Sequence, residues 1–177
     1  METTDLIIIS FDTTPEHITL IRAINSLTGF NTLQAPVKQA LDWLSGLEKE
    51  EAARLIKRAA RCRVQIDPDL ETDFKRKSVK IPADRNKVQA VDDLFREVFH
   101  ISRIMRPFYL KVILAAFRLY LVAENEALGV KENAEADTVV DLFALAVSIS
   151  TMLMENNPSD RPYIDELRAT MRRRQAP

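Results

Sequence analysis

Hydrophobic positions along the first third of the chain predict a strand, three amphipathic helices and a closing strand. Residues 6–10 are apolar and β-branched almost throughout, which is typical of a covered strand. Three segments, at about 14–28, 36–44 and 48–61, then carry apolar residues at the three- and four-residue spacing of helices. Residues 62–66 alternate polar and apolar side chains, as a half-buried strand does. The pattern predicts a small domain of strands and helices over residues 1–67.

Capping residues support these helix boundaries. Thr13 or Thr14 is placed to cap the first helix, with Pro15 at its first helical position. Gly29 follows that helix, where a left-handed backbone is common, and Gly46 follows the second helix. The ends of both helices are therefore predicted from residues that lie next to them in the chain.

Residues 68–83 change from an acidic half to a basic half and contain two prolines. This composition predicts a solvated linker, within which residues 78–81 favour a short extended segment. We therefore expect the chain to fold as two separate modules, with their boundary in this stretch.

Residues 84–177 predict an all-α four-helix bundle. Asp84 is placed to cap its first helix, whose opposite, outward face includes Asp92. The inward positions of that helix share apolar character: Val88, Val91, Leu94, Phe95, Val98, Ile101 and Met105. The second helix is expected over 108–128 with Gly129 as its stop, the third over about 135–155, and the fourth from residue 159 or 160 onwards. The fold class predicted for the whole chain is α+β.

Bulk composition favours a cytoplasmic protein without a membrane segment. The chain has 177 residues, and its 25 Lys and Arg balance 26 Asp and Glu. A single cysteine excludes an intrachain disulfide, and the N-terminus lacks the basic start of a signal peptide. A membrane span over 108–128 is the rival interpretation of the most apolar helix. Lys111, Arg118, Glu124 and Glu126 interrupt its apolar run, so we expect no span.

The sequence shows no recognisable motif for catalysis, phosphate binding or metal binding. Its three glycines lie far apart, so they form no phosphate-binding loop. His17 and His100 are its only histidines, and neither lies in a metal-spaced cluster with Cys62. Adjacent acids such as Asp92 and Asp93 point apart on a helix and do not form an acid–base pair. We therefore expect a protein that is not an enzyme and that needs no cofactor or metal.

Three short motifs, in order, resemble the C-terminal domain of the ribosomal stalk protein L7/L12. The first helix runs from LIRAI at 20–24 to a Thr-Gly-Phe sequence at 28–30, where the family has Thr-Gly-Leu. The second, VKQALDWLSG at 37–46, is similar to the family's Leu-Lys-Glu-Ala helix. The third, KEEAARLIK at 49–57, is similar to its Lys-Glu-Glu-Ala helix. Residues 31–36 depart from the family as an insertion, and no room exists for its strand between the second and third helices.

The resemblance implies a docking head that binds a protein partner through its first two helices. Arg22 and Lys38 keep the basic character of the family's surface, and Phe30 lies beside them as an apolar anchor. Our leading hypothesis is a non-catalytic cytosolic adaptor with an L7/L12-like head. Its partner would be another protein or a second copy of the chain.

A nucleic-acid-associated protein is the alternative hypothesis. Basic residues cluster at 54–63 and again at 75–77 although the chain is nearly neutral. The first cluster presents Arg54, Lys57, Arg58 and Arg61 on the outward side of the third helix. Such a face attracts phosphate groups, and its binding would weaken steeply with salt.

Overall fold

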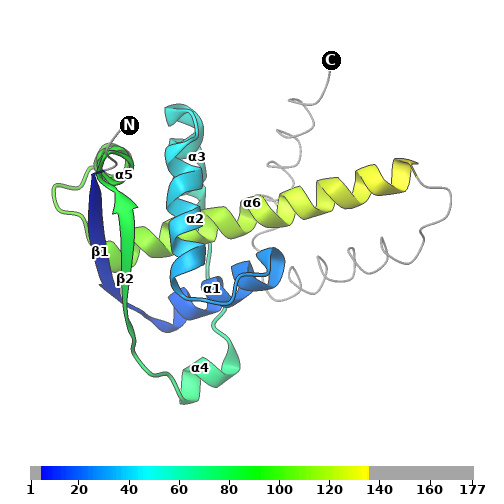
Figure 1. Ribbon diagram of the computed structural model, residues 1–177, viewed down its shortest axis with the longest axis horizontal. Helices are drawn as coiled ribbons and strands as arrows, with labels where there is room; N and C mark the ends of the chain where they lie inside the picture. Colours follow the sequence, from blue (N-terminus) through cyan, green and yellow to red (C-terminus); the bar gives the residue numbers. More distant parts are fainter. Residues whose placement is uncertain (1–4, 136–177) are drawn as a thin grey trace. The chain divides into compact units, whose positions relative to one another are not determined.

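The computed structural model describes residues 5–135 of the chain, a mixed fold of two strands and six helices (Figure 1). The elements are, in chain order, β1 (Leu6–Asp12), α1 (Pro15–Thr28), α2 (Gln34–Ser45), α3 (Lys49–Ala59), α4 (Pro68–Thr72), β2 (Ser78–Asp84), α5 (Arg85–Phe99) and α6 (Arg106–Glu135). The described chain divides into two compact units, with the first ending at Phe117 and the second beginning at Arg118.

The sheet consists of β1 and β2, which pair antiparallel with Ile9 opposite Ile81 (Figure 1). Side chains alternate across it because successive residues of a strand point to opposite faces. The core face consists of buried Ile9, Phe11, Val79, Ile81 and Ala83. The opposite face is exposed. Leu6 and Ile8 lie on it with 60% and 63% of their surface accessible, so β1 is covered on one face only.

The strand partner of β1 corrects two predictions. Residues 62–66 form no strand, although they alternate as expected. The extended segment predicted at 78–81 is confirmed, but it is a full strand with a buried face and not part of a solvated linker. The stretch 68–83 also contains α4 and lies inside the first compact unit. The chain therefore crosses the predicted boundary to complete its sheet.

Helix α1 begins and ends as its sequence predicts. The Thr14 side chain accepts a hydrogen bond from the backbone N–H of His17, and Pro15 occupies the first turn. Gly29 follows the helix with φ +79°, a left-handed conformation that glycine adopts without a steric penalty. The N-terminus of α5 is equally local in origin, since the Asp84 carboxylate accepts from the backbone N–H groups of Asn86 and Lys87.

Helices α5 and α6 differ from their predictions at three positions. Asp92, expected on the outward face of α5, is buried and only 8% exposed. Met105, expected to face inward, lies before α6 and is 66% exposed. Gly129 does not stop α6, which continues to Glu135. A glycine inside a helix costs about 1 kcal/mol, which the other residues of so long a helix offset.

The first unit contains a continuous apolar core. Helix α2 packs against β2, α1 and α5, and α3 packs against α5. The ring of Trp43 on α2 lies 5.3 Å from the ring of Phe117, the last residue of this unit. The second unit is described only over 118–135 of α6, where Leu119, Val122 and Ala123 are buried. The third and fourth helices predicted for the bundle lie outside the described residues.

His17 joins the start of α1 to the start of α6 inside the first unit. Its Nδ1 accepts from the backbone N–H of Thr14 at 2.9 Å, and its Nε2 lies 2.7 Å from the carbonyl oxygen of Pro107. A carbonyl can only accept, so Nε2 must carry a proton. Because Nδ1 accepts a hydrogen bond, it carries none, and the ring is neutral. Burial lowers the pKa of His17, against weaker opposing effects of the Pro107 carbonyl and Glu16.

Protonation of His17 is therefore expected to destabilise the fold at low pH. Because the folded pKa is lower than the unfolded value of about 6.5, the unfolded chain binds the extra proton first. The contribution of His17 is fully present above about pH 6.5 and falls below it, with a slope of at most about 1.4 kcal/mol per pH unit. Urea unfolding of the wild type and of His17→Gln at pH 7.5 and pH 5.5 measures it. The pH dependence should be smaller in His17→Gln, and equal dependence would contradict this role.

Candidate functional site

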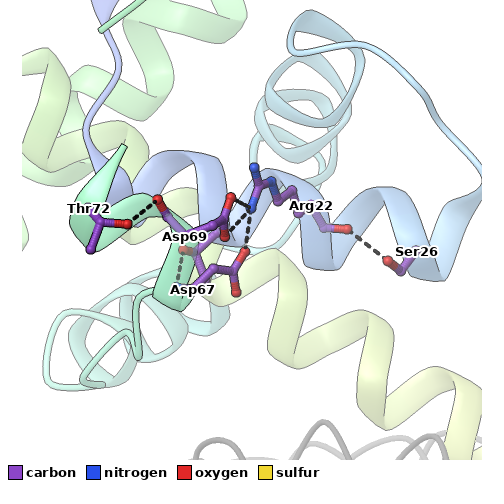
Figure 2. Close-up of polar contacts among 6 residues, drawn as sticks. Arg22, Ser26, Asp67, Asp69 and Thr72 are labelled. Atoms are coloured by element: carbon purple, nitrogen blue, oxygen red, sulfur yellow. Dashed lines mark hydrogen bonds and ion pairs between the residues drawn. The ribbon is translucent and has the colours of Figure 1, made fainter. Parts of the chain in front are cut away.

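Arg22, the first predicted docking residue, forms ion pairs with both Asp67 and Asp69 (Figure 2). Its Nη1 lies 3.0 Å from a carboxylate oxygen of each aspartate. The backbone N–H of Asp67 also donates to the hydroxyl of Thr19 at 3.1 Å, which fastens the start of α4 to α1. Arg22 lowers the pKa of Asp69 through their hydrogen bond. Two carboxylates thus surround one guanidinium, so Arg22 is exposed but does not present a free positive charge.

The other two docking residues are Phe30, after α1, and Lys38, on α2. Phe30 is half-buried just after Gly29, and its backbone N–H donates to the hydroxyl of Thr28 at 3.4 Å. Lys38 is exposed on α2. The described contacts do not join Arg22, Phe30 and Lys38, so a single patch formed by all three stays a prediction.

The alternative basic face lies on α3 and just beyond its end. Arg54 and Lys57 are exposed on the helix, Arg61 is exposed two residues after it, and Arg58 is half-buried. In the described part of the chain, no ion pair is seen for these three exposed cations. The first turn of the helix contains Glu50 and Glu51 and its last turn Lys57 and Arg58, an order that the helix dipole favours. The dipole thus accounts for the two cations of the last turn without a nucleic-acid ligand.

The second basic cluster, at 75–77, takes part in the edge of the sheet. Arg76 forms an ion pair with Asp12 of β1. The carbonyl of Lys77 accepts from the backbone N–H of Thr13 at 2.8 Å, and the backbone N–H of Lys77 donates to the Thr13 hydroxyl at 3.1 Å. These contacts extend the pairing of β1 with β2 beyond the strands. This cluster therefore has a structural role.

A hollow between the α2–α3 turn and α5, of about 320 Å³, was not predicted from the sequence; we call it the α2–α5 groove. Its floor is apolar and consists of Leu44, Leu47, Ala52, Ala90, Val91 and Leu94. Its rim is charged, since Lys49, Asp93 and Glu97 line the opening with Ser45. The volume is at the lower end of the range of about 300–1,000 Å³ that is usual for binding pockets. Most of these floor residues were predicted as inward, but their meeting across three helices depends on the tertiary fold.

An ion pair spans the rim of the α2–α5 groove. Lys49 on α3 lies 2.6 Å from Glu97 on α5, with about 60% of each side chain exposed. Asp93 is paired instead with Arg96, one turn along α5, at 3.0 Å. Water screens exposed pairs, which therefore contribute little to stability, so both can open at small cost. The rim offers two carboxylates and one ammonium group around an apolar floor.

The described residues contain no group of three or more His, Cys, Asp or Glu side chains that could hold a metal ion. Cys62 is half-buried, and its thiol donates to the carbonyl of Arg58 at 3.5 Å. His100 is exposed at the end of α5, where it adopts a left-handed conformation. Within residues 5–135, no helix has both the length and the apolar character needed to cross a membrane.

Comparisons with known proteins leave the family of this chain open. No protein-family model, no curated protein and no solved structure matches it. The resemblance to the L7/L12 domain is therefore still a prediction. The three helices that carry its motifs are present in the expected order, whereas the closing strand at 62–66 is not.

Proposed function

We propose that this protein is a non-catalytic adaptor that captures a protein partner in the α2–α5 groove. The observation that carries the proposal is the combination of an apolar floor with a charged rim. Buried apolar centres surrounded by polar rims are the usual anatomy of protein interfaces. The L7/L12-like motifs support the same class of function. The proposed docking surface is the groove and not the surface around Arg22, because Asp67 and Asp69 compensate the charge of Arg22.

The shape and charge of the groove define the partner's chemistry. Its volume of about 320 Å³ accommodates an anchor of one or two large apolar side chains. Glu97 is paired with Lys49 and Asp93 with Arg96, both in exposed pairs that open at small cost, so a basic side chain next to that anchor can bind either carboxylate. Such a residue would compete with Lys49 for Glu97 and open the ion pair across the rim. We therefore propose a partner segment in which a leucine- or phenylalanine-sized residue lies beside an arginine or lysine.

The nucleic-acid alternative has weaker support. Arg54 and Lys57 are exposed on α3 and Arg61 just beyond its end, but the first turn of the same helix carries two acidic residues. The Arg76 side chain of the second cluster is paired with Asp12 at the sheet, and Lys77 is fixed there through its backbone. Binding of a protein partner is therefore the better-supported function.

Ala90→Arg should abolish partner capture while leaving the fold intact. Ala90 is exposed on α5 and lines the groove, so a long charged side chain there fills the hollow without entering the core. We expect stability to change by no more than about 0.5 kcal/mol and affinity to fall at least about tenfold, which is about 1.4 kcal/mol. Urea unfolding measures the stability, and quantitative affinity capture with the full chain, followed by titration of the purified partner, measures the affinity.

Gln39→Arg is the control, since it adds the same charge at an exposed position of α2 that lies outside the groove lining. It should capture the same protein as the wild type. Equal capture by Ala90→Arg and Gln39→Arg would remove the groove from the proposal. If the wild type binds no protein at all, the adaptor function itself is wrong.

A further inference from the structure

The two outer edges of the β1–β2 sheet differ in their ability to pair with another strand. With only two strands in the sheet, each has one edge that is not paired within the described residues. An unpaired edge presents a row of N–H and C=O groups that can template a further strand. Sequence and register decide which of the two edges is suited to this.

The register shows which groups of β1 face outward. The backbone N–H of Thr13 donates to the carbonyl of Lys77, and that of Arg85 donates to the carbonyl of Asp5. In antiparallel pairs the hydrogen-bonded positions alternate, so the odd-numbered residues of β1 face β2. Leu6, Ile8 and Ser10 therefore direct their N–H and C=O groups to the outer edge. No hydrogen bond within the described residues reaches those groups.

The outer edge of β2 is protected, whereas that of β1 is not. By the same alternation, Lys80 and Pro82 are outward-facing residues of β2. Proline has no N–H to donate, and an edge lysine opposes pairing; both are common means of blocking an edge strand. Among the outward-facing residues of β1, Leu6, Ile8 and Ser10 are neither proline nor charged, and the one charged residue, Asp12, ends the strand. Leu6 and Ile8 are also more than half exposed beside that edge.

We propose that two copies of this chain pair through β1, antiparallel, about a two-fold axis at Ile8. This register places Ile8 opposite Ile8 of the second copy and Leu6 opposite Ser10. Every residue of the paired segment 6–10 is then uncharged, and Asp5 and Asp12 lie outside it. A parallel pairing in register would instead bring the two Asp12 side chains together, which is unfavourable.

A second copy suits this edge because a two-fold interface needs only one self-complementary surface. Pairing joins the two small sheets into one four-stranded sheet and places the exposed Ile8 side chains against each other across the axis. Cross-strand apolar pairs of this kind each contribute up to about 1 kcal/mol. Five paired residues form a small interface, so the dimer should be weak and concentration-dependent. This inference does not depend on the α2–α5 groove.

Sedimentation of the full chain from roughly 1 µM to 1 mM tests the proposal. The wild type should shift from monomer to dimer over this range. Ile8→Pro removes an outward N–H that makes no bond to β2, and Ile8→Lys places like charges opposite each other at the axis. Both variants should remain monomeric at the highest concentration, with at least a tenfold weaker association.

Lys80→Pro is the control, because it makes the same change on the outer edge of β2 and should dimerise as the wild type does. Circular dichroism confirms that each variant is folded, and Ile8→Lys keeps the test valid if Ile8→Pro unfolds the sheet. A wild type that stays monomeric throughout, or a dimer that persists in Ile8→Lys, would overturn the proposal.

Discussion

Replacing Phe117 with alanine should lower the free energy of unfolding by about 3–5 kcal/mol, which is the usual cost of removing a buried aromatic ring. Phe117 is 3% exposed, and its ring packs against Trp43 of α2. The substitution removes apolar contacts and leaves a cavity that the surrounding helices can only partly close. Urea denaturation measures the change, with Trp43 as the only tryptophan and therefore an unambiguous fluorescence probe.

Met105→Ala is the control for this experiment, because Met105 is 66% exposed just before α6. It should change stability by no more than about 0.5 kcal/mol. Circular dichroism should accompany fluorescence, since loss of the Phe117 ring alters the surroundings of Trp43 even in the folded state. A loss below about 1 kcal/mol for Phe117→Ala would show that this side of α6 does not pack as described.

Asp92→Ala should cost about 2–3 kcal/mol, the second-largest effect that we expect. Asp92 forms two hydrogen bonds with Arg106, at 2.9 Å and 3.2 Å, and Arg106 also lies over the ring of buried Tyr109. Removing the carboxylate leaves the guanidinium without its partner. Arg106 keeps 29% of its side chain exposed, so water relieves part of the cost and places it below that of a fully buried pair.

Asp93→Ala is the matched control for Asp92→Ala. Asp93 is the next residue, but its side chain is 61% exposed in an ion pair with Arg96, so its loss should cost no more than about 0.5 kcal/mol. The double variant Asp92→Leu with Arg106→Leu should recover most of the stability, because it leaves no buried charge unpaired. Equal costs for Asp92→Ala and Asp93→Ala would contradict the role of the buried pair.

The same buried group affects the ionisation of Tyr109. Burial raises the pKa of Tyr109 well above its usual value, and the nearby charge of Asp92 adds to this effect. Tyr109 is 1% exposed and also packs against Phe95, with ring centroids 4.5 Å apart. The phenol therefore stays neutral over the whole range of pH in which the stability measurements would be made.

The sequence alone determined α1, α2, α3 and α5 and several of their ends, but not α4 or the full length of α6. Thr14, Pro15 and Gly29 mark the ends of α1, and Asp84 caps α5, through hydrogen bonds and backbone preferences that span only a few residues. Apolar spacing likewise identified the inward sides of α1, α2 and α5, because a helix turns by a fixed angle for each residue. Interactions this close in sequence can be recognised without knowing where the rest of the chain lies.

The partner of β1 and the chemistry around single charges were decided only by the tertiary structure. Residues 62–66 and 78–84 both alternate, and nothing local indicates which of them pairs with β1. Proline at position 82 disfavours a strand over 78–84 in the sequence, and only the fold shows that Pro82 faces the outer edge, where proline is tolerated. The sequence predicts Arg22 as a free docking residue, but the fold places Asp67 and Asp69 beside it. The sequence also predicts Asp92 as exposed, but the fold buries it against Arg106.

In the candidate site, too, the sequence determined the apolar faces and the fold decided how they meet. Leu44, Ala52, Val91 and Leu94 were assigned correctly to inward faces, but the groove that they form with the Lys49–Glu97 rim joins segments about 40 residues apart. Periodicity tells which side of a helix is apolar, because that property depends on neighbours one turn away. Which two apolar sides meet, and where they leave a hollow, depends on how the whole unit packs, so only the folded chain could show it.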